Sequence, residues 1–217
     1  MNNRFDLLIF DWDGTLINTI DWITYSLQTA AKRCDCDIPE AQAAKDVIGL
    51  SIQAATTALH PSVDTKTHDQ LVKHYSEIYA SKQLSRADLF PDTFEMLLEL
   101  KQAGYQLAVA TGKTRRGLNE ALHATQTEHL FTATRCADET QSKPDPTMLL
   151  EIMQVTSNAP ERSLMVGDSI HDLQMANNAR ISSVAVSCGA NSKETLQTYQ
   201  PLLSLNHATE LLAYLSR

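Results

Sequence analysis

Short apolar runs that end in a glycine, a hydroxyl or an acid recur along the chain and predict the strands of a parallel sheet. Strands buried on both faces of a sheet are typically near-continuous apolar runs. The clearest runs cover residues 6–10, 105–110, 163–167 and 182–187, and a weaker one lies near 132–136.

Helical patterns alternate with these runs. The segment 93–103 and the segment that follows Pro146 both repeat apolar residues with the period of a helix that buries one face. The stripes are Phe94, Leu97, Leu98 and Lys101 in the first segment, and Met148, Leu149, Ile152 and Met153 in the second. Alternating strands and helices predict an α/β fold, with a doubly wound, Rossmann-like parallel sheet as its core.

The stretch from 17 to 84 interrupts this alternation, because it has helical periodicity and no convincing strand. We therefore expect a catalytic core of residues 1–16 and 85–217, with a small α-helical cap domain, residues 17–84, inserted between its parts. The insertion begins just after the first strand, a position that suits a lid over a site at the end of that strand. Extra packing for the core is the alternative explanation.

Composition narrows the function classes. A chain of 217 residues can bury one core plus a smaller insertion. The net charge of −8 argues against a nucleic-acid surface, which would be basic. No apolar run approaches the ~18 residues of a membrane span, so we expect no membrane partner and a cytoplasmic location. The four cysteines lack C-x-x-C spacing and are interpreted as reduced thiols. Nothing in the pattern distinguishes a monomer from a homodimer.

Candidate chemistry begins at the end of the first predicted strand, where Asp11 and Asp13 follow an apolar run and precede Gly14. Loops at the carboxyl ends of parallel strands form the crevice in which ligands bind. An acidic turn that caps the next helix would have the same spacing. Three further segments favour a ligand site: Thr111-Gly112 after the second strand, Lys143-Pro144 before a helix, and Asp168 with Asp172 after another strand.

These four segments, in this order, resemble the signature motifs of the haloacid dehalogenase-like superfamily. The resemblance covers residues 5 to 190 and is similar to the branch of phosphoglycolate phosphatases and β-phosphoglucomutases, which carry a helical cap after the first motif. It implies that Asp11 is the nucleophile and that Asp13 exchanges protons with the leaving group and water. It also implies a Mg²⁺ site formed by Asp11, Asp13, Asp168 and Asp172, with Asp13 contributing its backbone carbonyl. For Asp172, an ordinary acid at a helix N-terminus is the alternative.

Thr111, Gly112 and Lys143 would then bind the phosphoryl oxygens, since fixed donors stabilise the charge of the transferred group. Gly49 resembles the specificity loop of capped relatives, although a glycine that ends a helix over 40–48 explains it equally well. Arg115 is a candidate substrate contact. Its cluster with Lys113 and Arg116 also reads as a solvated helix face, the interpretation we favour. His171 is expected to face solvent.

The resemblance implies a Mg²⁺-dependent phosphatase for a small phosphorylated metabolite, a phosphomonoester similar to phosphoglycolate or a sugar phosphate. A sugar phosphomutase is the main alternative, and Thr15 is more typical of the phosphatases. A 2-haloacid dehalogenase fits less well because such relatives lack an acid at the position of Asp13. A non-catalytic phospho-receiver would lack the helical insertion. One departure from the family pattern is Arg180, where relatives often have glycine.

Overall fold

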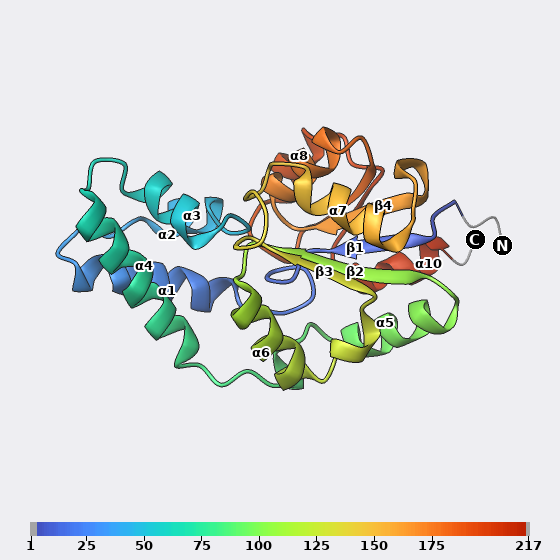
Figure 1. Ribbon diagram of the computed structural model, residues 1–217, viewed down its shortest axis with the longest axis horizontal. Helices are drawn as coiled ribbons and strands as arrows, with labels where there is room; N and C mark the ends of the chain where they lie inside the picture. Colours follow the sequence, from blue (N-terminus) through green and yellow to red (C-terminus); the bar gives the residue numbers. More distant parts are fainter. Residues whose placement is uncertain (1–3, 216–217) are drawn as a thin grey trace.

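The computed structural model describes residues 4–215, and within them the core is built on a six-stranded, all-parallel sheet (Figure 1). The strand order is β3-β2-β1-β4-β5-β6. The strands are β1 (Leu7–Phe10), β2 (Gln106–Thr111), β3 (Ala133–Cys136), β4 (Ser163–Gly167), β5 (Ser182–Val186) and β6 (Leu203–Leu205). This is the order of a doubly wound fold, in which the chain changes direction across the sheet between β1 and β4.

Five strands lie where the apolar runs predicted them, but β6 was not anticipated. It is three residues long, lies at the edge of the sheet and is only partly buried. An edge strand of this length carries no continuous apolar run, so the rule that found the other strands does not detect it.

Helices cover both faces of the sheet, and the side chains of β1 alternate between them. Leu8 and Phe10 face a core shared with α5 (Thr93–Gln102) and α6 (Arg115–Thr125). Leu7 and Ile9 face a core shared with α7 (Thr147–Thr156) and α8 (Ile170–Asn178). Figure 1 shows α7 and α8 above the sheet and α5 and α6 below it.

The two predicted helical stripes differ in outcome. In α7, Met148, Leu149, Ile152 and Met153 are all buried, as predicted. In α5 the buried residues are Thr93, Met96, Leu97 and Leu100, so the predicted stripe was wrong at Leu98 and Lys101, which are exposed, while Phe94 is partly buried. The helix turns its 96/97/100 face to the sheet because that face carries the continuous apolar surface.

The insertion is helical throughout: residues 20–80, all of which are described, form four helices and contain no strand. The helices are α1 (Ile20–Arg33), α2 (Ala41–Asp46), α3 (Ile52–Leu59) and α4 (Thr65–Ala80). Ile23, Leu27, Ala44, Ile48 and Ala55 lie at the centre of a small core of their own. Ser51 and Asp64 cap the N-termini of α3 and α4 by accepting backbone N–H groups. This helical body projects from one end of the sheet (Figure 1).

Two adjacent chain segments connect the helical body to the core. The outgoing segment pairs with the returning one through hydrogen bonds from the Asn18 N–H to the Asp88 carbonyl (2.8 Å) and from the Phe90 N–H to the Leu16 carbonyl (3.0 Å). The two crossings are therefore tied together side by side.

The remaining elements close the core. They are the helices α9 (Lys193–Gln197) and α10 (Leu211–Leu215) and the 3₁₀ turns η1 (Arg86–Asp88), η2 (Glu128–Leu130), η3 (Pro160–Arg162) and η4 (Ala208–Glu210). Arg180, which follows α8, has a φ of 58°, a left-handed conformation that costs arginine about 1 kcal/mol relative to glycine. No helix in the described part of the chain has the length and apolar character needed to cross a membrane.

Candidate active site

The predicted site residues come together where the strand order reverses. β1 pairs with β2 on one side and with β4 on the other, so the residues that follow these strands lie at one edge of the sheet. Asp11 follows β1, Thr111 ends β2, and Asp168 follows β4. In doubly wound folds, ligands bind at this switch point.

Three acids form the centre of the site. Asp11, Asp168 and Asp172 each offer a carboxylate oxygen, and these oxygens lie within 4.8 Å of one another. All three side chains are buried. Like charges at such short range repel strongly in a low dielectric, so the cluster needs positive charge beside it.

Lys143 supplies part of that charge. Its Nζ donates to Asp11 Oδ1 at 2.6 Å and to Asp172 Oδ1 at 2.7 Å, and the lysine is itself buried. Lys143 therefore links Asp11 to Asp172. Lys143 is followed by Pro144, and the peptide bond between them is cis.

The local sequence shapes the positions of the other two acids. Asp168 accepts hydrogen bonds from the Thr15 hydroxyl (2.7 Å) and the Ala190 N–H (2.8 Å). Asp172 occupies the third position of α8 and forms a capping box with Ser169, whose hydroxyl donates to it at 2.6 Å. Asp172 thus serves both as a helix-capping acid and as a partner of Lys143.

Two glycines leave the space that Asp168 occupies. A Cβ atom on Gly14 or on Gly189 would overlap the Asp168 carboxylate. Gly14 also has a φ of +83°, a backbone conformation that residues other than glycine rarely adopt. Gly14 directly follows the first pair of predicted acids, whereas no motif in the sequence indicated Gly189.

Burial and mutual repulsion shift the acidity of the cluster. Burial, with Asp172 beside it, raises the pKa of Asp168 to about 7. Burial also raises the pKa of Asp11 well above its ordinary value, although Lys143 opposes this shift. For Lys143, burial lowers the pKa, but the two acids outweigh it and the net shift is upward, so this lysine stays protonated.

These properties fit a bound divalent cation. Three buried carboxylates face one lysine, which leaves an excess of negative charge, and the donor atoms are oxygens, the ligands that Mg²⁺ prefers. The raised pKa values of Asp11 and Asp168 indicate charge that the chain alone does not neutralise. The Asp13 side chain lies outside this group of three.

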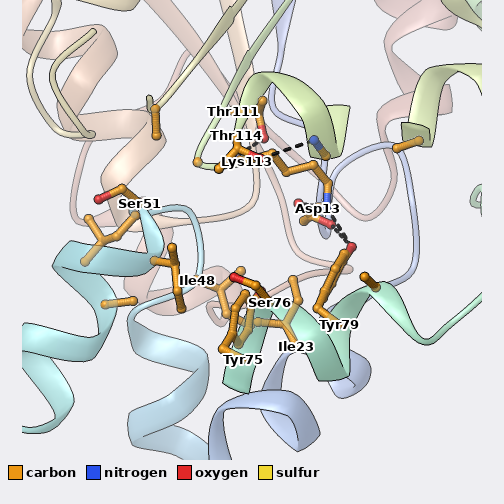
Figure 2. A pocket seen from close by; sticks show the side chains of 18 of the residues that line it. Asp13, Ile23, Ile48, Ser51, Tyr75, Ser76, Tyr79, Thr111, Lys113 and Thr114 are labelled. Carbon is orange, nitrogen blue, oxygen red and sulfur yellow. Dashed lines mark hydrogen bonds and ion pairs between the residues drawn. The ribbon is translucent and has the colours of Figure 1, made fainter. Parts of the chain in front are cut away.

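Asp13 instead faces a cavity beside the cluster and is held by three groups (Figure 2). The Thr19 hydroxyl donates to its Oδ1 at 2.6 Å, and the Tyr79 hydroxyl does so at 3.3 Å. Lys113 Nζ lies 3.1 Å from its Oδ2 and also donates to the Tyr79 hydroxyl at 2.6 Å. Tyr79 belongs to α4, so the helical body and the core meet at this acid.

Lys113 and Tyr79 were not anticipated in these positions. Lys113 was expected on a solvated face, but its side chain is only 9% exposed. No sequence signal pairs residue 79 with residue 113, because their contact depends on how the helical body packs on the core.

Arg115, the candidate substrate contact, pairs with residues outside the cavity. Its guanidinium pairs with Glu139 at 2.6 Å and donates to the Thr134 hydroxyl at 2.7 Å, and Arg115 does not line the cavity. We therefore leave it out of the substrate contacts proposed below. Arg116 does line the cavity, but its side chain is exposed and pairs with Glu120.

Gly49 and Gly112 meet where the helical body rests on the core. A Cβ atom on Gly112 would lie 2.6 Å from the Gly49 carbonyl oxygen and closer still to that of Leu50. Nearby, the Ser51 N–H donates to Ser142 Oγ at 2.9 Å. His171, expected to face solvent, instead has its Nε2 2.8 Å from the Asp46 carbonyl oxygen.

Comparison with known proteins agrees with this fold. A family model described as haloacid dehalogenase-like hydrolase matches residues 8–186. "Pyrophosphatase PpaX" from Bacillus mycoides (strain KBAB4) is 26% identical over 215 residues, covering 99% of this chain and 98% of the relative. The same-named protein from Bacillus cereus (strain Q1) is 27% identical over 214 residues, covering 98% and 97%.

Solved structures share the fold at lower identity. A hydrolase from Pseudomonas syringae has a TM-score of 0.88 at 20% identity and covers 97% of this chain and 98% of its own. A β-phosphoglucomutase from Clostridium difficile has a TM-score of 0.85 at 17% identity and covers 98% and 96%. The doubly wound α/β fold is thus confirmed.

The matched family defines the class of protein: this chain belongs to the haloacid dehalogenase-like hydrolases, an enzyme family. The resemblance identified from the four motifs is confirmed.

Proposed function

We propose that the chain is a Mg²⁺-dependent phosphatase that hydrolyses a small phosphomonoester through an aspartyl-phosphate on Asp11. The observation that carries this proposal is the convergence of Asp11, Asp168 and Asp172 around Lys143 beside a cavity that Asp13 also lines. A carboxylate next to a cation site and a second acid facing the substrate space are the groups that stepwise phosphoryl transfer needs.

Each residue has a distinct part in the proposed reaction. Asp11 attacks phosphorus, and Lys143 neutralises charge on the phosphoryl oxygens as the leaving group departs. Thr111 and the Gly112 N–H act as further donors. When bound, Mg²⁺ would withdraw charge from the phosphoryl group and offset the repulsion among the three acids.

Asp13 is proposed to move the protons. It gives one to the leaving oxygen, and the resulting carboxylate then takes one from the water that hydrolyses the aspartyl-phosphate. Its position supports this role, because Thr19, Tyr79 and Lys113 hold its carboxylate at the cavity wall. Lys113 must release Asp13 during the cycle for the carboxyl group to carry a proton.

The test is phosphate release from a panel of small phosphate esters, with Mg²⁺ or with EDTA. Pyrophosphate belongs in the panel because the curated relatives are named as pyrophosphatases. We expect turnover only with the metal. We also expect Asp11→Asn to reduce kcat at least about 10³-fold, while Asp69→Asn, at an exposed helix position, changes it little.

Two outcomes would contradict the proposal. Equal turnover in EDTA, or full activity of the Asp11→Asn variant, would remove the metal-assisted nucleophile. Conversion of one sugar phosphate into its isomer, without net release of phosphate, would assign the chain to the phosphomutase alternative.

A further inference from the structure

A cavity of about 470 Å³ extends from Asp11 and Asp13 into the space between the helical body and the core. Asp11, Asp13 and Thr111 line one end of it, and helices α1, α3 and α4 line the other. Figure 2 shows Asp13, Thr111 and Lys113 on one side, facing Ile23, Ile48 and Tyr75. Its volume is typical of a site for a drug-sized organic molecule and far exceeds that of a single phosphoryl group.

The wall opposite the acids is predominantly apolar. Six aliphatic side chains of the helical body contribute to it: Ile23, Leu27, Val47, Ile48, Leu50 and Ile52. Tyr75 adds an aromatic ring, which stacks on Tyr79 with ring centroids 5.7 Å apart. The polar side chains on this side include those of Ser51, Gln53, Ser76 and Glu77. Such a wall favours a substrate with apolar surface, because the transfer of that surface out of water lowers the free energy.

The cavity offers no uncommitted cation among the described residues that line it. Three of these residues are Lys or Arg, and each already pairs with an acid. The pairs are Lys82 with Asp88 at 2.9 Å, Lys113 with Asp13 at 3.1 Å, and Arg116 with Glu120 at 2.8 Å. A second anionic group on the substrate would have to compete with Asp13 for Lys113, or take Lys82 or Arg116 from an acid that already neutralises it.

Building on the phosphatase activity proposed above, we propose that the substrate carries one phosphoryl group on an uncharged, largely apolar organic group, alkyl or aryl. The phosphoryl group lies at the acids, and the organic group packs against Ile23, Ile48 and Tyr75. Pyrophosphate and phosphoglycolate fit this cavity poorly, because each brings a second anion and neither fills the apolar end.

The test uses linear alkyl phosphates from methyl to hexyl, whose leaving groups are chemically alike. These are compared with pyrophosphate, phosphoglycolate and glucose 1-phosphate, all in the presence of Mg²⁺. Because each buried CH₂ contributes about the same transfer free energy, we expect kcat/KM to rise roughly three- to fourfold per CH₂ until the cavity is filled. Hexyl phosphate should then exceed the three polar substrates.

A matched pair of variants locates the effect. Ile48→Thr replaces an ethyl group by a hydroxyl in the apolar wall, and Val155→Thr replaces a methyl group by a hydroxyl at a 59% exposed position on α7. We expect Ile48→Thr to lower the hexyl-to-methyl ratio of kcat/KM by about tenfold. Val155→Thr should leave this ratio as it is.

A flat alkyl series, or a higher kcat/KM for pyrophosphate or phosphoglycolate, would overturn the inference while leaving the phosphatase activity in place. The absence of turnover with every substrate would instead overturn the proposed function and this inference together. Both results come from the wild-type chain, so they do not depend on the variants folding.

Discussion

Thr15 is two residues past Asp13, and its hydroxyl donates to Asp168 Oδ1 at 2.7 Å. The residue is buried. Its hydrogen bond favours the ionised form of Asp168, whose pKa burial raises to about 7. A group of this kind orients a metal-binding carboxylate without touching the metal itself.

We predict that Thr15→Val weakens Mg²⁺ binding by about 10- to 100-fold, since valine keeps the shape of threonine but removes the donor. The dissociation constant is measured by titrating activity and thermal stability with Mg²⁺. Thr15→Ser is the control and should retain most of the affinity. Equal affinity in the valine variant would show that the Ala190 N–H alone suffices to orient Asp168.

At the level of single residues, the sequence indicated some of the charged groups and few of their neutral partners. Asp11, Asp168, Asp172 and Lys143 were identifiable because their four segments, in this order, resemble the motifs of one family, whereas Lys113 belongs to none of them. Thr19 and Gly189 were not identifiable, because a threonine or a glycine in a loop has many structural explanations. Their importance arises from close approach to an acid that is distant in the sequence.

Among the secondary structure elements, the loop at Gly49-Leu50 packs closely against Gly112, which follows β2. Gly112 faces the carbonyl oxygens of both loop residues, and a side chain there has no room. The backbone of the loop cannot move away without displacing the helices on either side of it.

We predict that Gly112→Ala lowers kcat/KM by about 10- to 100-fold, because the added methyl displaces the loop that covers the cavity. The N–H of residue 112 is kept, so a lost donor would not explain the effect. Steady-state kinetics measures the loss, and limited proteolysis of residues 46–51 should show increased exposure. Unchanged kinetics would mean that turnover does not require the close contact between this loop and Gly112.

Elements with a strong period were predictable, while contacts between elements were not. The apolar stripe of α7 predicts which face of the helix is buried. In α5, apolar residues lie on two sides, so packing against the sheet determines that Leu98 is exposed. The meeting of Tyr79 and Lys113 at Asp13 likewise depends on the orientation of α4 over the core. The local sequence does not predict that orientation.

For the molecule as a whole, the buried acids make stability depend on pH. A folded-state pKa of about 7 for Asp168, above the ordinary 3.8, means that the folded chain holds this proton more tightly than the unfolded chain. The stabilisation is fully present below the ordinary pKa and is lost as the pH rises through about 7. Lys143 stays charged across this range and adds no slope.

We predict that without metal the free energy of unfolding falls between pH 5 and pH 8, as measured by urea denaturation in EDTA. Added Mg²⁺ should stabilise the chain more at pH 8 than at pH 5, because protons compete for the same oxygens. Asp168→Asn is the control: it should flatten the slope while other groups titrate as before. A metal effect independent of pH would contradict the assignment of these acids as ligands.

The paired crossings between Leu16 and Phe90, and between Asn18 and Asp88, also limit how the enzyme can admit and release molecules. Two connecting segments that are hydrogen-bonded to each other act as a single hinge. The helical body can therefore rotate about this hinge but cannot translate as a whole relative to the core. Displacement during such a rotation grows with distance from the hinge. Substrate would therefore enter and product leave at the edge far from the hinge, where Ser51 contacts Ser142 and Asp46 contacts His171. The rate of turnover would then be limited by how often those two contacts break.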